Sequence, residues 1–522
     1  MKVSRQLPGC LAAMRAPKPL LGALMERAQR SPFSRADARA LSSPSNEGIG
    51  APFLHAFAKA SPGAPPAAVH VRQDGACYVI DQDGNRLLDG LAGLWSVSLG
   101  YDQPRLVEAA AKQMRTLPYY HSFWNQGHDA GYKLAEELRE FIPLPITKVA
   151  FTGGGSDAND TAVKLVWYYN NALGRAEKKK VIARTKAYHG VTALAASCSG
   201  LASLHSGFGS STAPNAPLAG FIHVSCPHMY RTALPGEGEE AFAARLAQEL
   251  DETIQREGPD TVGALIAEPL MGAGGVMPPP KGYFQLVQKV CAKHDVLIIS
   301  DEVVCGFGRL GSRFGFEAYG FTPDIITMAK GLTSSYAPMG ALAMTDKVSS
   351  VIADGSSGSL LGHGYTYGAH PVSCAVASEC LAIFRDDKVL ENVRAQSPAL
   401  QEGLVRVCQD SPIVGEVRGR GLIAAVELVG DRETRTPFPA AAAVGTFFCS
   451  AARRHGVIVR AIGDVVAVSP PLVIKSHEIA EIVEGYRLAL QETEAMVRSK
   501  GLLSATASTA TPLFTESLQP LP

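Results

Sequence analysis

The feature that most constrains this fold is a series of short apolar runs, rich in β-branched residues, that alternate with longer stretches of helical pattern. Near-continuous apolar runs are typical of strands buried on both faces, and such strands separated by helices predict a parallel sheet covered on both sides. The runs are residues 148–151, 180–184, 262–268, 296–300 and 324–329. We therefore expect an α/β fold, with a large domain built on a mostly parallel sheet between helices.

A chain of 522 residues leaves room for more than one domain. We assign residues 101–368 to the large domain. A second, smaller α/β domain is expected over residues 369–500, where a helical stretch at 373–386 precedes strand-like runs at 423–429 and 457–462. Residues 501–522 contain Ser, Thr and Pro with little to pack, which predicts a disordered tail.

The first 45 residues differ in composition from the rest of the chain. They contain eight Lys and Arg residues, several serines, and only Glu26 and Asp37 as acids. A basic, Ser-containing, acid-poor leader is typical of an organellar transit peptide, with a disordered extension as the alternative. We predict residues 1–45 to be a transit peptide for the mitochondrial matrix, with plastid or cytoplasm as the alternatives.

The composition favours a small-molecule function. Lys+Arg and Asp+Glu each total 49, so no net charge is available to hold nucleic acid or an anionic membrane, and neither is expected as a partner. We find no apolar run approaching the roughly 18 residues that a membrane span needs. The ten cysteines include no Cys-x-x-Cys pair, which favours buried thiols over a zinc site.

Three features follow three of the predicted strands. Residues 152–160, TGGGSDAND, lead into a helix, and their uncovered amides make an anion cradle that fits a phosphate. Asp301 ends the run at 296–300, and Lys330 ends the run at 324–329. Alone, Asp301 could be a capping or metal-binding group and Lys330 a solvated side chain. Together the three match the handles of pyridoxal phosphate, which are its phosphate, pyridine nitrogen and aldehyde.

With these residues in place, the chain from about Leu54 to Lys500 resembles the class III pyridoxal-phosphate aminotransferases of fold type I. Within that family it is most similar to the plant-type mitochondrial 4-aminobutyrate (GABA):pyruvate transaminases. The motifs that carry the resemblance are LAGLWSVSLG, YYHSFWN, GGGSDANDTAVKLVWYYNNALGR, AYHG, AEPLMGAGGV, SDEVVCGFGRLG, AKGL, GYTYGAHPVSCAVA, VRAIGD and SPPL. The resemblance implies that residues 46–100 pack on the small domain and the active site.

The resemblance also implies the catalytic residues. Lys330 would be joined covalently to the cofactor aldehyde and, once freed by substrate, would move a proton between the substrate carbon and the cofactor. Asp301 would keep the pyridine nitrogen protonated, which makes the ring an electron sink. Glu268 would lie close to this centre and orient its neighbours.

The remaining cofactor contacts follow from the same resemblance. Gly155 and Ser156 would bind the phosphate, and Thr366 would reach the phosphate of the neighbouring subunit. Tyr188 would stack on one ring face and Val303 would pack on the other. The resemblance thus implies a homodimer, or a tetramer of paired dimers, with active sites at the subunit interface. Without the resemblance, Tyr188 and Val303 could equally be core residues.

For the substrates, an amino donor and a 2-oxo acid acceptor, the resemblance implicates Arg460, Trp95 and Phe123. Arg460 matches an arginine that binds the substrate carboxylate, a task suited to the bidentate guanidinium. Trp95 and Phe123 match pocket aromatics. Without the resemblance, Arg460 is a surface ion pair and the two aromatics are core residues.

Two departures from the family pattern narrow the acceptor. Glutamate-linked members carry an arginine where this chain has Val191, and a glutamate where it has Ala273. Without these charges a second carboxylate, as in 2-oxoglutarate, would be buried unpaired, which is costly. We therefore expect 4-aminobutyrate as donor and pyruvate or glyoxylate as acceptor, giving succinate semialdehyde and alanine or glycine.

Other functions remain open at this stage. An omega-aminotransferase acting on β-alanine, or on aromatic amines and aldehydes such as vanillin, is the main alternative. A catalytically silent pyridoxal-phosphate-binding scaffold, an aminomutase and a decarboxylase share the same residues. A metal-dependent hydrolase using Asp301 and Glu302 is a further alternative, although no His-Glu-x-x-His pattern is present and no metal is expected.

Overall fold

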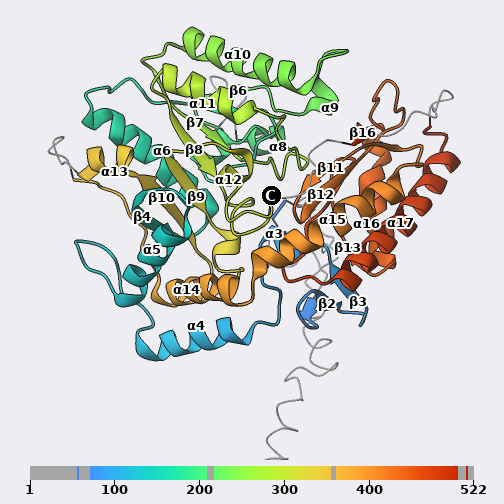
Figure 1. Ribbon diagram of the computed structural model, residues 1–522, viewed down its shortest axis with the longest axis horizontal. Coiled ribbons are helices and arrows are strands. Elements are labelled where there is room, and N and C mark those ends of the chain that lie inside the picture. The colour runs from blue at the N-terminus through green and yellow to red at the C-terminus, as the bar shows by residue number, and fades with distance from the viewer. Residues whose placement is uncertain (1–55, 58–70, 209–216, 354–359, 504–512, 515–522) are drawn as a thin grey trace, which may run out of the picture. The chain divides into compact units, whose positions relative to one another are not determined.

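A computed structural model describes residues 56–57, 71–208, 217–353, 360–503 and 513–514 (Figure 1). The chain from His70 to Pro522 forms one compact unit, and Met1–Val69 form another. Only residues 56 and 57 of the first unit are described, so the predicted transit peptide at 1–45 lies outside the described residues. Within the described ranges, no helix combines the length and the apolar character that crossing a bilayer requires.

A seven-stranded sheet forms the centre of the 70–522 unit. Its strands, in spatial order, are β4 (Ile146–Thr152), β10 (Gly340–Thr345), β9 (Ile325–Met328), β8 (Leu297–Asp301), β7 (Val262–Ala267), β5 (Lys180–Arg184) and β6 (Phe221–Val224). Every neighbouring pair is parallel except the two made by β10, which is antiparallel to both β4 and β9. The predicted mostly parallel sheet is confirmed; β6 and β10 were not predicted.

The apolar runs form strands because both faces of the sheet are covered. Along β8, Leu297 and Ile299 pack in one apolar cluster and Ile298 packs in another. Helix α6 (Gly155–Ala172) covers the first face, and α11 (Tyr283–Lys293) lies on the second (Figure 1). A strand buried on both sides has no solvent-facing positions, so its sequence shows no polar alternation.

The strand directions bring three loops to one edge of this sheet. Strands β8 and β9 are parallel neighbours, with Asp301 opposite Thr327. Asp301 therefore ends its strand beside the segment that leads to Lys330, the first residue of the 3-10 helix η1 (Lys330–Leu332). Strand β4 runs in the same direction and leads into α6. The carboxyl end of a parallel sheet is where ligands bind in such folds.

A five-stranded sheet belongs to the C-terminal part of the chain, drawn in orange and red in Figure 1. Its order is β14 (Arg460–Ile462), β15 (Val465–Val468), β12 (Ile423–Leu428), β11 (Val414–Arg420) and β16 (Leu513–Phe514). Helices α15 (Val389–Cys408), α16 (Val444–Arg454) and α17 (Ser476–Ser499) accompany it. Strand β16, which lies within the segment 501–522 predicted to be a disordered tail, pairs in parallel with β11.

A small third sheet joins the N-terminal segment to the C-terminal part. Its strands are β1 (Val71–Gln73), β2 (Tyr78–Asp81), β3 (Arg86–Asp89) and β13 (Val457–Ile458). Strands β3 and β13 are parallel. Thus residues more than 360 positions apart share one sheet, as in the pair Leu88 and Val457. The domain boundaries expected from the sequence stay a prediction.

The other helices of the described chain connect and cover these sheets. Helices α4 (Pro104–Thr116) and α14 (Pro371–Asp386) run alongside each other below the large sheet in Figure 1. The rest are α3 (Ala92–Trp95), α5 (Asp129–Phe141), α7 (Ala193–Cys198), α8 (Ala202–His205), α9 (Met229–Thr232), α10 (Glu239–Glu257), α12 (Gly315–Tyr319), α13 (Asp346–Ala353) and the 3-10 helix η2 (Ala440–Ala442).

Candidate active site

Asp301 is a buried carboxylate at the end of β8, with an exposed fraction of 3%. Its Oδ2 accepts hydrogen bonds from Asn159 Nδ2 and His189 Nδ1, both at 2.8 Å, and its Oδ1 accepts one from the Val303 amide at 3.1 Å. Three donors offset the cost of burying a negative charge. The carboxylate is therefore fixed in place and available to a cation at the sheet edge.

Asn159 and His189 hold this carboxylate, and sequence reasoning missed both. Asn159 projects from α6; its Nδ2 also donates to the carbonyl of His189 at 2.7 Å, and its Oδ1 accepts from Thr327 Oγ1 at 2.7 Å. His189 Nδ1 faces an acceptor, so it carries the proton. Both residues lie inside motifs already quoted. For Asn159 a signal was available in the sequence, because a polar Asn on a helix that faces an apolar sheet needs hydrogen-bond partners.

Lys330 starts η1 with a φ of 46°, in the left-handed region that non-glycine residues rarely adopt. Such strained backbone is concentrated at functional sites. The surrounding protein desolvates the amine and lowers the pKa of Lys330 to about 8, against the opposing charges of Asp301 and Glu268. A lysine with a lowered pKa supplies the neutral, nucleophilic amine near physiological pH.

The loop between β4 and α6 makes the anion cradle. Gly155 and Ser156 are the first two residues of α6, where backbone amides have no partner within the helix and the helix dipole is positive. Ser156 Oγ accepts a hydrogen bond from the Val191 amide at 3.2 Å. Position 190 must be glycine, because its φ is +133° and a Cβ there would lie 2.4 Å from Ser156 Oγ. Both methyls of Val303 lie 3.1 Å from where a Cβ on Gly155 would be.

Glu268 follows β7 and is buried, with an exposed fraction of 3%. Its Oε1 accepts a hydrogen bond from the Tyr188 amide at 3.1 Å, and its Oε2 accepts one from the Gly272 amide at 2.8 Å. Desolvation raises the pKa of Glu268. The side chain thus ties the segment that carries Tyr188 to the turn that begins at Gly272.

Trp95 lies beneath two cations. Lys330 Nζ is 5.6 Å from the centroid of the indole ring, and the Arg460 guanidinium carbon is 5.1 Å from it. Burial lowers the pKa of Arg460, and Tyr188 is the one charge partner that opposes this shift. Among the residues that the structure describes, none forms an ion pair with Arg460. An unpaired, partly buried guanidinium beside a nucleophilic amine is a site for an anionic group of a ligand.

These features together fit pyridoxal phosphate. The cradle of α6 suits its phosphate, Asp301 suits a protonated pyridine nitrogen, and Lys330 suits its aldehyde. A family model for "Aminotransferase class-III" matches residues 59–490 of the chain. The chain belongs to the class-III aminotransferase family. It is therefore a pyridoxal-phosphate-dependent transaminase, of fold type I.

Named relatives of this aminotransferase include plant enzymes. It is 48% identical over 429 residues to "Gamma aminobutyrate transaminase 3, chloroplastic" of Solanum lycopersicum, covering 82% of this chain and 81% of that protein. It is 49% identical over 429 residues to "Gamma-aminobutyrate transaminase 1, mitochondrial" of Oryza sativa subsp. japonica, with the same coverage of both chains.

Solved structures of similar enzymes share the fold. The omega transaminase from Pseudomonas jessenii in complex with PMP is 45% identical, with a TM-score of 0.81, covering 86% of this chain and 97% of that one. A thermostable six-fold mutant from the same organism is 46% identical, also with a TM-score of 0.81, covering 84% and 96%.

Two expected site residues of the aminotransferase lie apart from the cluster around Lys330. The Phe123 ring packs on Gly364, where a Cβ would lie 3.1 Å from it. Thr366 is exposed, and its carbonyl accepts a hydrogen bond from the Tyr119 hydroxyl at 2.7 Å. Neither forms a hydrogen bond, ion pair or ring contact with Lys330, Trp95 or Arg460 in the described chain.

The structure disfavours the metal-hydrolase alternative, because Glu302 does not converge with Asp301. The Glu302 carboxylate accepts the amides of Gly315 and Phe316, both at 2.8 Å, at the start of α12. Desolvation raises the pKa of Glu302 to about 7. Its two oxygens are thus occupied on the side of α12, where they stabilise a helix end.

Cofactor uptake by the aminotransferase should depend on pH through Lys330. The amine is protonated below a pKa of about 8, whereas an ordinary lysine stays protonated up to about 10.5. Because only the neutral amine attacks an aldehyde, we expect the rate of cofactor uptake by the apo-enzyme to rise through pH 8. Stopped-flow absorbance measures the rate of uptake. Nα-acetyl-lysine, whose side-chain amine is free, is the control for titration of the cofactor itself. A rise centred near pH 10.5 would contradict the desolvated amine.

Proposed function

We propose that this aminotransferase transfers the amino group of 4-aminobutyrate to pyruvate or glyoxylate, giving succinate semialdehyde and alanine or glycine. The observation that carries the proposal is the unpaired Arg460 guanidinium lying over the same indole ring as Lys330. A donor with an amine at one end and a carboxylate at the other can meet both groups. The names of the tomato and rice relatives, gamma-aminobutyrate transaminases, support this choice of donor.

In this proposal each residue near Lys330 has one task. Pyridoxal phosphate, when bound, supplies an aldehyde that combines with amines and a ring that withdraws electrons. Asp301 would keep the positive charge on the pyridine nitrogen of the bound cofactor. Lys330 acts as the nucleophile and then holds, at Nζ, the proton removed from the amine-bearing carbon of the donor. The start of α6, with Gly155 and Ser156, binds the phosphate.

The other nearby residues position the reacting groups. Tyr188 and Val303 would hold the cofactor ring between them, and Glu268 orients the Tyr188 backbone through its hydrogen bond. Trp95 forms an apolar floor beneath Lys330 and Arg460, and only 2% of its own surface is exposed. On that side the two cations face an aromatic ring in place of water, which strengthens their charge interactions.

The acceptor preference rests on Ala273. This residue packs in the same apolar cluster as Trp95 and Val465, which places a methyl group there instead of a carboxylate. A glutamate at this position could neutralise Arg460 when an uncharged group enters; alanine cannot. Val191 is 56% exposed and offers no charge to a second carboxylate. A dicarboxylic acceptor would therefore bury an unpaired charge.

We expect pyruvate and glyoxylate to be used at least about 10-fold faster than 2-oxoglutarate, since an imperfectly paired buried charge costs at least about 1.4 kcal/mol. A matrix of donors against equal concentrations of the three acceptors, with products identified by mass spectrometry, measures this. Faster turnover with 2-oxoglutarate would contradict the proposed preference for pyruvate or glyoxylate. The same product analysis separates transamination from aminomutase and decarboxylase activity.

Removing the guanidinium should reveal which substrates it binds. We expect Arg460→Ala to lower kcat/KM for 4-aminobutyrate by an amount equivalent to about 2 to 5 kcal/mol of binding free energy, because truncating one partner of a buried charge pair costs that much. An uncharged amine such as 1-phenylethylamine has no carboxylate to lose and should scarcely change. Steady-state kinetics with both donors measure the effect. Equal losses of kcat/KM for the two donors would show that Arg460 does not bind the substrate carboxylate.

An omega-aminotransferase with a broader donor range is the second candidate. The observation that favours it is the likeness to the Pseudomonas jessenii omega transaminase, together with the large aromatic floor that Trp95 provides. β-Alanine would use the same Arg460 contact, whereas an aromatic amine or vanillin would rely on ring contacts. The donor matrix separates the two candidates. A pyridoxal-phosphate-containing protein that transfers amino groups to none of these acceptors would instead be a silent binder.

We further propose that the active unit is a homodimer, with a tetramer as the alternative. Thr366 and Phe123 would then act in the site of the second subunit, which accounts for their distance from Lys330. Their surroundings expose large rings, since Trp124 is 81% and Tyr367 is 68% exposed. Such an aromatic surface is typical of a protein interface.

The site of action is proposed to be the mitochondrial matrix. The basic, acid-poor composition of residues 1–45 supports an organellar transit peptide. The names of the plant relatives include both mitochondrial and chloroplastic enzymes, which supports an organelle without choosing between the two.

A further inference from the structure

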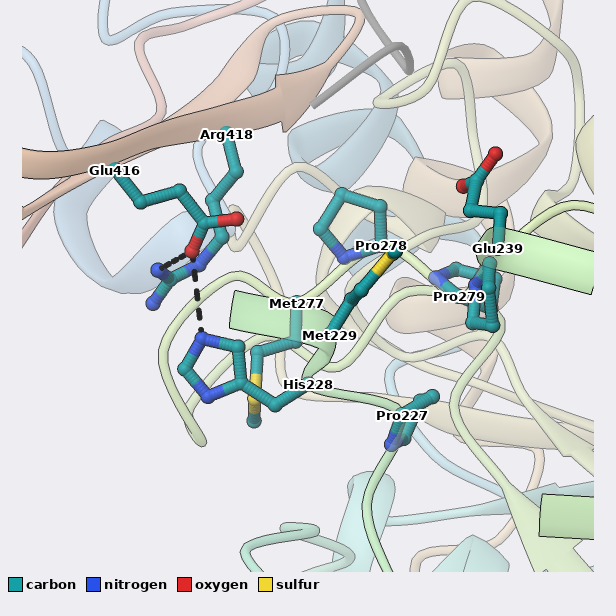
Figure 2. A pocket seen from close by; sticks show the side chains of 10 residues that line it. Pro227, His228, Met229, Glu239, Met277, Pro278, Pro279, Glu416 and Arg418 are labelled. Atoms are coloured by element: carbon teal, nitrogen blue, oxygen red, sulfur yellow. Dashed lines mark hydrogen bonds and ion pairs between the residues drawn. The ribbon is translucent and has the colours of Figure 1, made fainter. Parts of the chain in front are cut away.

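Outside the cluster around Lys330, the structure contains a second buried polar cluster: His228, Glu416, Arg418 and Glu427. The most exposed of the four, His228 and Glu427, are 4% exposed. Arg418 Nη1 donates to Glu416 Oε2 and to Glu427 Oε2, both at 2.5 Å. Figure 2 shows Glu416 between Arg418 and His228, with an interaction to each.

This cluster is charge-balanced without a metal ion. The ligand atoms of His228, Glu416 and Glu427 lie within 4.8 Å of one another, a spacing that could hold a cation. However, the Arg418 guanidinium bonds both carboxylates, and Arg231 Nε donates to Glu427 at 2.5 Å. Two arginines thus offset two glutamates, and a divalent ion would have to sit against Arg418. The cluster therefore holds Arg418 in place, and does not need a metal to be stable.

The Nε and Nη2 atoms of Arg418, which make neither ion pair, face a turn over residues 272–277 in the active-site region. Its Nε donates to the carbonyls of Gly275 and Val276, both at 3.0 Å, and its Nη2 donates to the Gly275 carbonyl at 2.7 Å. Met277 and Pro278, the next residues, lie close to the cluster in Figure 2. A planar guanidinium can make these bonds and the two ion pairs simultaneously.

The turn over residues 272–277 reaches Trp95 at its other end. The Gly272 amide donates to Glu268, and a Cβ on Gly272 would lie 2.9 Å from Trp95 Cζ3, so its backbone packs on the indole ring. Within the turn, the Gly275 and Val276 amides both donate to the Gly272 carbonyl. A chain of contacts thus runs from Arg418 through the turn to the ring beneath Lys330 and Arg460.

A second path leads to the strand that carries Arg460. A Cβ on Gly275 would lie 3.8 Å from Val465 Cγ2. Val465 begins β15, which is paired with β14, and Ile462 lies opposite it in that pairing. The turn therefore packs against the hairpin that positions the Arg460 side chain.

We propose that Arg418 is a positioning residue for substrate selection. By holding the carbonyls of Gly275 and Val276, it fixes the turn 272–277 against Trp95 and the β14–β15 hairpin, and so sets the geometry in which Arg460 meets a substrate carboxylate. The selection of carboxylates rests on the proposed function. The fixing of the turn does not, and can be measured separately.

The test uses Arg418→Lys in the full-length holoenzyme. Lysine keeps a positive charge for Glu416 and Glu427, but its compact ammonium cannot also hold both carbonyls. We expect deuterium exchange at the amides of 272–277 to quicken by about 10-fold. The KM for 4-aminobutyrate should rise by about 10- to 100-fold, as misplacement of a binding group does. The kcat, the cofactor absorbance and the KM for 2-aminobutane, an uncharged amine without a ring, should stay as in the parent enzyme.

Arg432→Lys is the matched control. Arg432 is also an arginine that holds backbone carbonyls near β11, donating from Nε to Val414 at 2.7 Å, but the partners that the structure describes for it lie outside the 272–277 turn. Gly275→Ala disturbs the same contact from the turn side and leaves the side chains of both ion pairs unaltered. Its φ of +130° strains an alanine, and the added methyl would lie 3.2 Å from Arg418 Nη2. It is expected to reproduce the Arg418→Lys pattern, and it carries the test if the lysine variant does not fold.

Unchanged exchange at 272–277 in the variant tested would overturn the inference, whatever the enzyme's substrates. Equal KM increases for 4-aminobutyrate and 2-aminobutane, or lost cofactor absorbance, would also overturn it, because they indicate general structural damage. If the parent enzyme transferred amino groups from no donor, the proposed function would fail, and the exchange measurement would still decide whether Arg418 fixes the turn.

Discussion

Lys330→Ala is expected to keep the fold and to lose transamination by at least about 10⁴-fold in kcat, because one change removes both the nucleophile and the proton carrier. The Lys330 amine is already desolvated, with a pKa lowered to about 8, so alanine removes a costly desolvated cation and should not destabilise the chain. Steady-state kinetics with 4-aminobutyrate and pyruvate, alongside circular dichroism, measure the two effects. The variant should also lose the yellow colour of the holoenzyme.

Lys347→Ala is the control for this prediction. Lys347 forms a partly exposed ion pair with Asp324 at 3.1 Å, at the end of the sheet away from the cofactor loops. Its removal should leave kcat within about 2-fold, since exposed ion pairs contribute little. Residual transamination by Lys330→Ala within about 10-fold of the parent enzyme would mean that another group does the chemistry.

Asp301→Asn should have the second largest effect. The amide is nearly isosteric, so its neighbours can stay in place, but the negative charge that holds a protonated pyridine nitrogen is gone. Losing one member of a buried charge pair costs about 2 to 5 kcal/mol, which corresponds to about 30- to 5000-fold in kcat/KM. In addition, His189 Nδ1 and Asn159 Nδ2 both donate to Oδ2 of Asp301. An asparagine replaces one carboxylate oxygen by an NH2 group, which cannot accept their hydrogen bonds.

The measurement combines kinetics with the dissociation constant for pyridoxal phosphate, and Glu302→Gln provides the comparison. Glu302 is the adjacent buried carboxylate, but it bonds the amides at the start of α12. We expect Glu302→Gln to lower the melting temperature and leave turnover per folded enzyme nearly unchanged. If the two variants lost turnover equally, Asp301 would have no role beyond that of a buried acid.

The strands that carry the site were predictable because their pattern has a local cause. Each of the runs at 180–184, 262–268 and 296–300 is buried on both faces, and this leaves an uninterrupted apolar sequence. Strand β10 has the same environment but reads GALAMT, in which only the last residue, Thr345, is β-branched, so it carries little of the β-branched signal. Its place between β4 and β9 follows from pairing across the sheet, which a local pattern does not encode.

The candidate site likewise contains residues that could be predicted from the sequence and residues that could not. Asp301 and Lys330 stand out because a charge at the end of an apolar run is costly, whereas Asn159 and His189 become meaningful only once α6 and the 187–190 segment meet β8. Arg418 lies more than 140 residues from the turn that it holds. The proposed tasks of Thr366 and Phe123 need a second chain, so one chain alone does not bring them to Lys330.

The most direct measurement of the central claim is peptide mapping of the holoenzyme after borohydride treatment, which reduces a carbon–nitrogen double bond to a stable single bond. The account predicts the pyridoxyl mass on the peptide that contains Lys330, and on no other lysine. A pyridoxyl group on a different lysine, or none on a protein that has been loaded with pyridoxal phosphate, would contradict it.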